Sequence, residues 1–188
     1  MARTNHTRFV ILGFLAHKPS SGYDIRKAIA ASLGNFWNES FGQIYPALRD
    51  LEAEGWVRRT EGEADRRARR QTYTLTGTGH AAFMAWLREP AAPHIYRVET
   101  LVKLFFAPLA GPGEAREHVR RFLAEHRALV AKYRAIGARL DRELPDQPGL
   151  PYWKLTVECG IAVGQAYVDW CERADAVLAG LAQGGSHA

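Results

Sequence analysis

One stretch of the chain, residues 40–76, changes its apolar spacing halfway along, and this change limits the folds that it can adopt. Its first part carries apolar residues at helical spacing and ends at Gly55, a residue type that commonly terminates helices. Ser40 and Gln43 precede the run with the spacing of a capping box, and Pro46 favours a helix start close to Ser40 or later. The buried positions would be Ile44, Ala47, Leu48 and Leu51. Beyond Gly55 polar and apolar residues alternate, so the stretch predicts one helix followed by two strands.

The loop between the two predicted strands is strongly basic. Four arginines fall within five positions, at Arg66, Arg67, Arg69 and Arg70. A local positive field of this kind suits the phosphate backbone of a nucleic acid. The alternative is a solvated hairpin tip, whose charge is softened by neighbouring acidic residues. Beside a helix of this length we favour DNA contact, and the stretch then has the form of a winged helix.

Charge is distributed unevenly along the chain. Of the 188 residues, those at 1–96 hold 13 Lys and Arg against 9 Asp and Glu, whereas those at 97–188 hold 12 against 11. The basic half is the half that carries the arginine loop, which points to a polyanionic partner there.

Several function classes find no support in the sequence. It has no glycine-rich phosphate loop, no zinc-spaced set of cysteine and histidine and no nucleophile elbow, so we expect no enzyme activity, no cofactor and no metal site. The amino-terminal residues do not form a signal peptide, and no apolar run reaches the length of about 20 residues that spans a bilayer. We therefore expect a cytoplasmic protein.

The flanking segments complete an amino-terminal domain. Residues 7–16 predict a buried helix, and Ser20 or Ser21 would cap a second helix after a short turn. Thr76 would cap another helix after the hairpin, and a linker with two prolines follows. The predicted fold class is mainly α-helical with a small β-hairpin wing. Its domains are a winged helix-turn-helix DNA-binding domain at residues 1–89 and a helical dimerisation and possible effector-binding domain at residues 97–182.

Two long helical segments make up most of the second domain, and each carries an apolar heptad seam. Gly160 and Gly164 lie one turn apart on the second seam, although glycine inside a helix costs up to about 1 kcal/mol. Their presence predicts the close approach of another helix. We expect an antiparallel pair that packs on its twin as a two-fold dimer, and a hairpin within one chain is the alternative. The predicted dimer contacts are Phe122, Leu129, Ile136, Gly160, Gly164, Tyr167 and Cys171.

The two cysteines, Cys159 and Cys171, are twelve residues apart on the last predicted helix. Twelve helical residues rise about 18 Å, which is too far for a disulfide between them. We expect two reduced thiols in the core.

Three runs of the sequence are familiar in combination. They read ILGFLAHKPSSGYDI, FWNESFGQIYPALRDLEAEGWV and YTLTGTGHAAFMAWL. In this order they resemble the PadR family of bacterial transcriptional regulators. The segment VETLVKLFF and the two long helices are similar to the carboxy-terminal domain of the longer members. The resemblance covers nearly the whole chain and implies a DNA-binding transcriptional regulator, most often a repressor.

The resemblance also implies which residues contact DNA. Gln43, Tyr45 and the neighbouring Arg49 would enter the major groove, where glutamine can pair with a base edge. Tyr23, Ser40 and Tyr45 would touch phosphates. The wing arginines Arg66, Arg67, Arg69 and Arg70 would lie along the minor groove or the backbone. The two tyrosines have an alternative role, which is to cover the small core.

Many members of the family respond to small aromatic compounds, so the resemblance raises an effector site that would release a repressor. Aromatic side chains could stack on a flat ligand, and a histidine could bond its carboxylate or phenol. The candidates are Phe105, His126, Tyr133, Tyr152, Trp153, Tyr167 and Trp170. Aromatic residues at helical spacing are usually core, which is the competing interpretation. The alternative function is a helical protein-interaction module without specific DNA binding.

Overall fold

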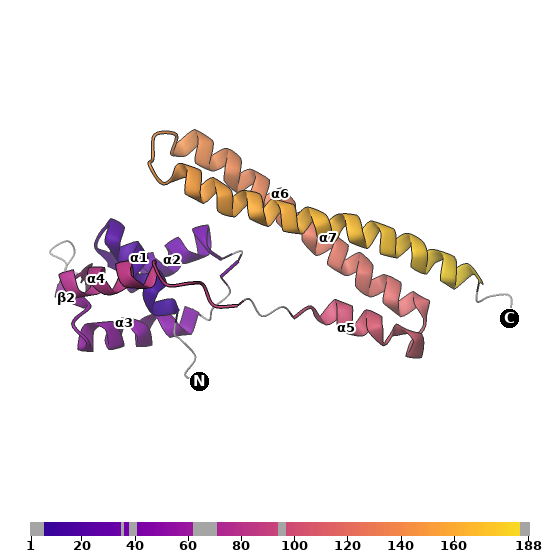
Figure 1. Ribbon diagram of the computed structural model, residues 1–188, viewed down its shortest axis with the longest axis horizontal. Coiled ribbons are helices and arrows are strands. Elements are labelled where there is room, and N and C mark those ends of the chain that lie inside the picture. Colours follow the sequence, from indigo (N-terminus) through magenta and orange to yellow (C-terminus); the bar gives the residue numbers. More distant parts are fainter. Residues whose placement is uncertain (1–5, 35, 38–40, 62–70, 94–96, 185–188) are drawn as a thin grey trace. The chain divides into compact units, whose positions relative to one another are not determined.

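The computed structural model describes residues 6–34, 36–37, 41–61, 71–93 and 97–184 (Figure 1). The chain divides into two compact units, Met1–Pro93 and His94–Ala188. Each unit has a hydrophobic core of its own. Within the described ranges, none of the helices combines the length and the apolar character that crossing a membrane requires.

The first unit packs helices around a small antiparallel sheet. Its elements are α1 (Thr7–His17), β1 (Ser20–Ser21), α2 (Gly22–Ser32), η1 (Phe41–Gln43), α3 (Ile44–Ala53), β2 (Val57–Glu61), β3 (Gln71–Leu75) and α4 (Gly77–Trp86). Strand β3 lies in the middle, where Tyr73 is opposite both Ser20 of β1 and Arg59 of β2. The sequence predicted the β2–β3 hairpin but a plain turn in place of β1. A strand of two residues is too short to show an alternating pattern.

The core of the first unit lies between α1, α2, α3 and the sheet. The helical apolar positions predicted in α3 are all buried. Helix α4 covers one side of α1, where Trp86 stacks on Phe9 with ring centroids 4.8 Å apart. Arg8 binds Glu54 at the end of α3 and lies over the Trp56 ring, which joins α1 to the start of the hairpin.

Hydroxyl caps begin two of the helices, as the sequence predicts. Ser21 Oγ accepts a hydrogen bond from the Asp24 amide at 3.2 Å, and Thr76 Oγ1 accepts one from the Gly79 amide at 3.1 Å. Helix α3 begins differently from the predicted capping box. The 3-10 turn η1 precedes it, the Gln43 side chain makes no capping bond, and Pro46 is its third residue. Proline is tolerated there because the first turn of a helix has amides without an internal acceptor.

Gly55 ends α3 as predicted, in a left-handed conformation with φ of 72°. The Trp56 amide donates to the Leu51 carbonyl at 2.9 Å, and the Gly55 amide donates to the Glu52 carbonyl at 3.0 Å. These two bonds form a Schellman motif, which satisfies carbonyls at the helix end and turns the chain into β2.

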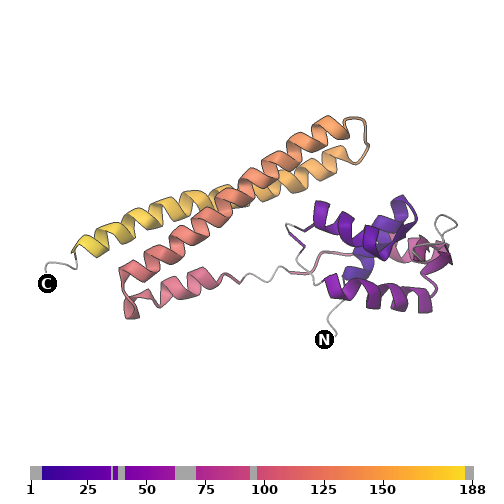
Figure 2. The same cartoon turned by 180° about the vertical axis from the view of Figure 1, so that it is seen from behind.

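The second unit is an antiparallel pair of long helices with a short helix beside it. Its elements are α5 (Glu99–Phe105), η2 (Ala107–Leu109), α6 (Pro112–Glu143) and α7 (Leu150–Gly184). Helices α6 and α7 run side by side and cross each other (Figures 1 and 2). The residues buried along this pair are Ala115, Val119, Val130, Tyr133, Val157, Val168, Cys171 and Leu178.

The close helix approach predicted at Gly160 and Gly164 is found between α6 and α7 of one chain. A Cβ added at Gly160 would lie 2.3 Å from Cζ of Tyr133, and one at Gly164 would lie 2.7 Å from Cγ2 of Val130. Cys171 is also fully buried in its own chain. The assignment of these two glycines and Cys171 to the dimer contact is therefore corrected. The other predicted contacts, Phe122, Leu129, Ile136 and Tyr167, are half-buried and stay predictions.

The prediction of two core thiols holds for Cys171 only, because Cys159 is exposed. Cys171 lies among the apolar residues of the second core, next to Val119 and Leu178. Burial raises the pKa of its thiol, so it stays protonated as a small apolar side chain.

Polar bonds between α6 and α7 fix how the two helices are aligned. Arg116 and Arg120 both bind Asp175, each with an N–O distance of 2.8 Å, and Lys154 binds Asp141 at 2.9 Å. The hydrogen bonds from Arg116 and then Arg120 lower the pKa of the Asp175 carboxyl. Exposed ion pairs contribute little stability one by one, but a slip of either helix would break all of them together. They therefore specify the register of the hairpin.

Candidate DNA-binding surface

Helix α3 turns its polar residues away from the core. Because Ile44 and Leu48 are buried, Gln43 and Arg49 are exposed, and the Tyr45 side chain is 53% exposed. Of the three residues predicted to enter the major groove, Tyr45 and Arg49 are exposed on α3, and Gln43 is exposed at the end of η1, directly before that helix. An amide, a phenol and a guanidinium are groups that hydrogen-bond base edges and phosphates.

The first turn of α2 adjoins the start of α3. The Tyr45 ring lies directly against the backbone of Gly22, where an added Cβ would be 2.8 Å from Cε1 of the ring. The next residue, Tyr23, is 45% exposed. Neither tyrosine is buried, which favours binding over a purely core role.

Arg26 joins this surface although the sequence analysis did not include it. Its guanidinium lies 5.4 Å from the centroid of the Tyr23 ring. The two residues are three positions apart on the exposed side of α2, so they share a face. The sequence signal for Arg26 was its spacing of three residues from Tyr23, a predicted phosphate contact.

Strand β2 carries basic residues beside α3. Arg58 is exposed, and Arg59 Nε lies 3.4 Å from Glu52 Oε1. This ion pair offsets the negative charge of Glu52 on α3. Tyr73 is buried beneath, and burial first and Glu52 second raise its pKa. Arg49 is thus an exposed positive group on α3, whereas Arg58 points to the opposite face of the sheet from Arg59, because neighbouring residues of a strand alternate in direction.

Five of the predicted DNA contacts lie outside the described residues. They are Ser40, Arg66, Arg67, Arg69 and Arg70. The last described pair of the β2–β3 ladder is Glu61 and Gln71, and the arginine loop lies between them in the sequence. The DNA contacts of the five residues stay predictions.

The seven predicted effector residues do not form one site. Tyr133 is buried against Gly160 within the helix pair, and Trp153 packs on Gly149 at the turn before α7. Tyr152 is 72% exposed near that turn, whereas Trp170 is 18 residues further along α7. Eighteen helical residues span about 27 Å, so these aromatic groups cannot hold one small ligand together.

Three of the candidates do gather in a single cluster. The His126 ring lies 4.6 Å from the Tyr167 ring, and Phe122 lies 4.1 Å from His126 and 6.4 Å from Trp170. His126 Nδ1 lies 2.9 Å from the Phe122 carbonyl oxygen, within its own helix. The cluster is half-buried between α6 and α7.

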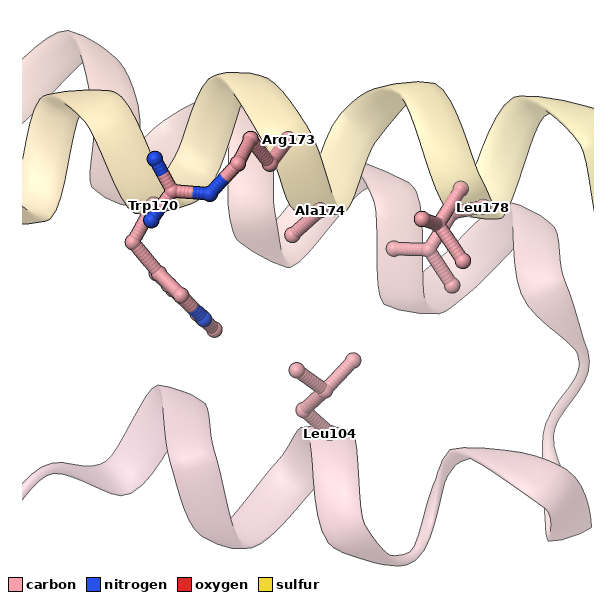
Figure 3. A pocket seen from close by; sticks show the side chains of 6 residues that line it. Leu104, Trp170, Arg173, Ala174 and Leu178 are labelled. Carbon is pink, nitrogen blue, oxygen red and sulfur yellow. The ribbon is translucent and has the colours of Figure 1, made fainter.

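An apolar groove of about 370 Å³ adjoins this cluster between α5 and α7. Figure 3 shows Leu104 of α5 facing Trp170, Ala174 and Leu178 of α7, with the Arg173 side chain extending toward Trp170. Val177 completes the lining. We call this the α5–α7 groove. Of its lining residues only Trp170 was predicted from the sequence to bind a ligand, because the aliphatic and small residues have the helical spacing of core positions.

Two family models match the chain and together cover both units. The transcriptional regulator PadR-like family matches residues 11–85, and the virulence activator alpha C-terminal family matches residues 96–179. The first match contains α2, α3 and the β2–β3 strands, and the second contains α6 and most of α7.

Individual relatives agree with this over most of their length. The negative transcriptional regulator PadR of Bacillus subtilis is 27% identical over 170 residues, which cover 88% of this chain and 93% of the relative. Its crystal structure in complex with operator DNA is 26% identical with a TM-score of 0.79, covering 91% of this chain and 98% of that chain. Its structure with p-coumaric acid is 26% identical with a TM-score of 0.73, covering 91% and 97%.

The Vibrio cholerae virulence activator AphA has the same fold. Its structure is 29% identical with a TM-score of 0.73, and the match covers 93% of this chain and 98% of that chain. The matches confirm the resemblance read from the sequence, and because the family consists of transcriptional regulators, they also confirm that no enzyme is expected. The chain belongs to the PadR-like family of DNA-binding transcriptional regulators, in the longer form that carries a virulence-activator-type carboxy-terminal domain.

Proposed function

We propose that this chain is a cytoplasmic, homodimeric repressor that binds a near-palindromic operator and is released from it by a small aromatic ligand. The observation that carries the proposal is the exposure of Gln43 directly before α3 and of Tyr45 and Arg49 on α3, opposite the buried apolar residues of that helix. Bacillus subtilis PadR, a negative regulator, binds operator DNA with a similar fold. The name of AphA describes an activator, so repression here follows the likeness to PadR.

Each exposed group has a chemical role on DNA. Gln43 suits adenine and Arg49 suits guanine, because their side chains can make two hydrogen bonds to those base edges. Tyr23, Ser40 and Tyr45 would bind phosphates, which fix the position of the helix in the groove. The wing arginines Arg66, Arg67, Arg69 and Arg70 would add contacts along the minor groove or backbone.

An apolar face on α5 and η2 supports the homodimer. Val102, Phe105, Phe106 and Leu109 are 57%, 78%, 56% and 88% exposed, and we call them the α5 apolar face. Exposed patches of this kind usually mark a surface that binds another protein. A second copy of the chain can cover it in an isologous contact, because each copy offers the same patch. Two recognition helices would then lie in successive major grooves, about 34 Å apart.

The α5–α7 groove supports an aromatic effector. Bacillus subtilis PadR binds p-coumaric acid, a planar phenol with a carboxylate. In this chain Trp170 and Leu104 would contact the ring, and Arg173 would pair with the carboxylate. Because Leu104 lies on the helix that also carries the α5 apolar face, a bound ligand would change how the two copies pack.

Dissociation of the protein from DNA by the ligand is expected to depend on Arg173. A labelled duplex from the region upstream of the coding sequence should bind the protein, and p-coumaric acid should dissociate it, as fluorescence anisotropy would show. Arg173→Ala should raise the required concentration about tenfold, the effect of losing one charge-assisted hydrogen bond. Arg121→Ala is the matched control, since Arg121 pairs with Glu117 on α6 and does not line the groove.

The possible outcomes separate the parts of the proposal. If p-coumaric acid dissociates both arginine variants from DNA at the same concentration, the ligand does not bind in the α5–α7 groove. If neither p-coumaric acid nor a panel of other aromatic acids dissociates the protein from DNA, the proposal of an aromatic effector is wrong. Equally weak binding to the upstream duplex and to unrelated DNA would favour a helical protein-interaction module.

A further inference from the structure

We infer that Gly22 is a positioning residue for DNA recognition: because it has no side chain, the Tyr45 ring can lie against the first turn of α2 and keep the orientation from which its hydroxyl binds DNA. The inference rests on the proposed contact between Tyr45 and DNA. It concerns a residue that has no side chain with which to bind a base or a phosphate.

The geometry leaves no room for a side chain at this position. A Cβ added at Gly22 would lie 2.8 Å from Cε1 and 3.3 Å from Cδ1 of Tyr45, and 3.2 Å from Cδ1 of Leu48. Carbon atoms in contact are normally about 3.5–4.0 Å apart. At least one of the two neighbours must therefore move when Gly22 is replaced by alanine.

The two neighbours differ in their freedom to move. Leu48 is completely buried in the core between α1, α2 and α3, whereas the Tyr45 side chain is 53% exposed. A close-packed interior resists displacement, but an exposed ring can rotate into solvent. An added methyl group would therefore displace Tyr45, and the effect would fall on the DNA-binding surface more than on the core.

The backbone does not require glycine at this position. In the described part of the chain the glycines with positive φ are Gly55 and Gly111, and Gly22 is an ordinary first residue of α2. Gly77 occupies the same place in α4, also after a hydroxyl cap, and a Cβ added there meets nothing within 4 Å. Gly22 and Gly77 thus differ mainly in the presence of the Tyr45 ring.

The test is a mutant cycle on the full-length protein. A duplex is first selected by the wild-type protein from a random-sequence library, and the scrambled duplex is its reference. Gly22→Ala should weaken binding to the selected duplex about tenfold, which is roughly the effect of losing one hydrogen bond to a charged group. Tyr45→Ala should weaken binding by a similar factor. The double variant should bind no more weakly than Tyr45→Ala, while Gly77→Ala should bind like the wild type.

Two results of the binding measurements would overturn the inference. One is full affinity in Gly22→Ala; the other is a Gly22→Ala loss that persists in the Tyr45→Ala background, which would assign the effect to Leu48 and the core. The Tyr45 ring resonances in NMR spectra give a readout without DNA: they should shift in Gly22→Ala and not in Gly77→Ala, and unchanged resonances also contradict the inference. If the wild type selects no duplex, the proposed function fails, and the ring resonances still decide whether Gly22 positions Tyr45.

Discussion

Replacing Gly79 by alanine is expected to destabilise the first unit by about 3 kcal/mol or more, combining overpacking with the loss of a helix cap. A Cβ at Gly79 would lie only 2.0 Å from the Trp56 carbonyl oxygen. That oxygen cannot yield easily, because it accepts hydrogen bonds from the Thr76 amide at 3.1 Å and from the Thr76 hydroxyl at 3.0 Å. Helix α4 would have to move away from the base of the hairpin, and the Thr76 cap would be lost. Small domains have only about 5–15 kcal/mol of stability, so the effect is large.

Amide hydrogen exchange read by mass spectrometry would measure this loss in each unit separately. Peptides from β3 and α4 should lose protection in Gly79→Ala, and peptides from α6 and α7 should not. Gly77→Ala is the control, because it adds the same methyl group to the same helix in open space. Equal protection in the two variants would show that the contact between α4 and the Trp56 carbonyl is not tight.

The double substitution Phe105→Asp and Leu109→Asp is expected to convert the protein to monomers. Both residues belong to the α5 apolar face and are mostly exposed in the single chain. Burying a large apolar side chain contributes about 1.5–3 kcal/mol, and in a two-fold interface each substitution acts twice. The dimer dissociation constant should therefore rise at least about a thousandfold, which sedimentation equilibrium would detect.

The control for this prediction lies on the same helix. Glu99 and Lys103 form an ion pair on the polar edge of α5, with an N–O distance of 2.8 Å. Replacing both by alanine should leave the dimer intact, since exposed pairs contribute little. A dimer that survives the two aspartates would place the contact elsewhere, such as on the half-buried Phe122, Leu129, Ile136 and Tyr167.

Much of the fold could be predicted from the sequence because its signals are local. Ser21 and Thr76 are hydroxyl residues in front of helical runs, and Gly55 supplies the positive φ that ends α3. Strand β1 could not be predicted, since its two residues become a strand only by pairing with β3. The 3-10 turn before α3 was likewise missed, because the spacing of Ser40 and Gln43 matches a capping box whether or not the helix starts there.

The functional surfaces likewise include features that local sequence patterns predict and features that depend on contacts between distant residues. The exposed residues of α3 follow from helical spacing, because a buried stripe fixes which residues face outward. The glycines of α7 correctly indicated a close helix, but a sequence does not say whether that helix belongs to the same chain; here it is α6, which carries Tyr133 and Val130. The α5–α7 groove depends on a contact between residues about 70 positions apart, and no local pattern reports it.

The salt dependence of operator binding tests most directly whether this chain is a sequence-specific DNA-binding regulator. Fluorescence anisotropy would compare the upstream duplex with a scrambled one across a salt series, for the wild type and for a variant with Arg66, Arg67, Arg69 and Arg70 replaced by alanine. We predict selective binding by the wild type, with a log–log slope that shrinks by up to about 0.9 for each phosphate that the variant no longer neutralises. If the variant binds selectively with the same salt slope as the wild type, the four arginines do not contact DNA phosphates. Equal, weak binding of the wild type to both duplexes, and to any duplex offered by a random library, would contradict the proposed function.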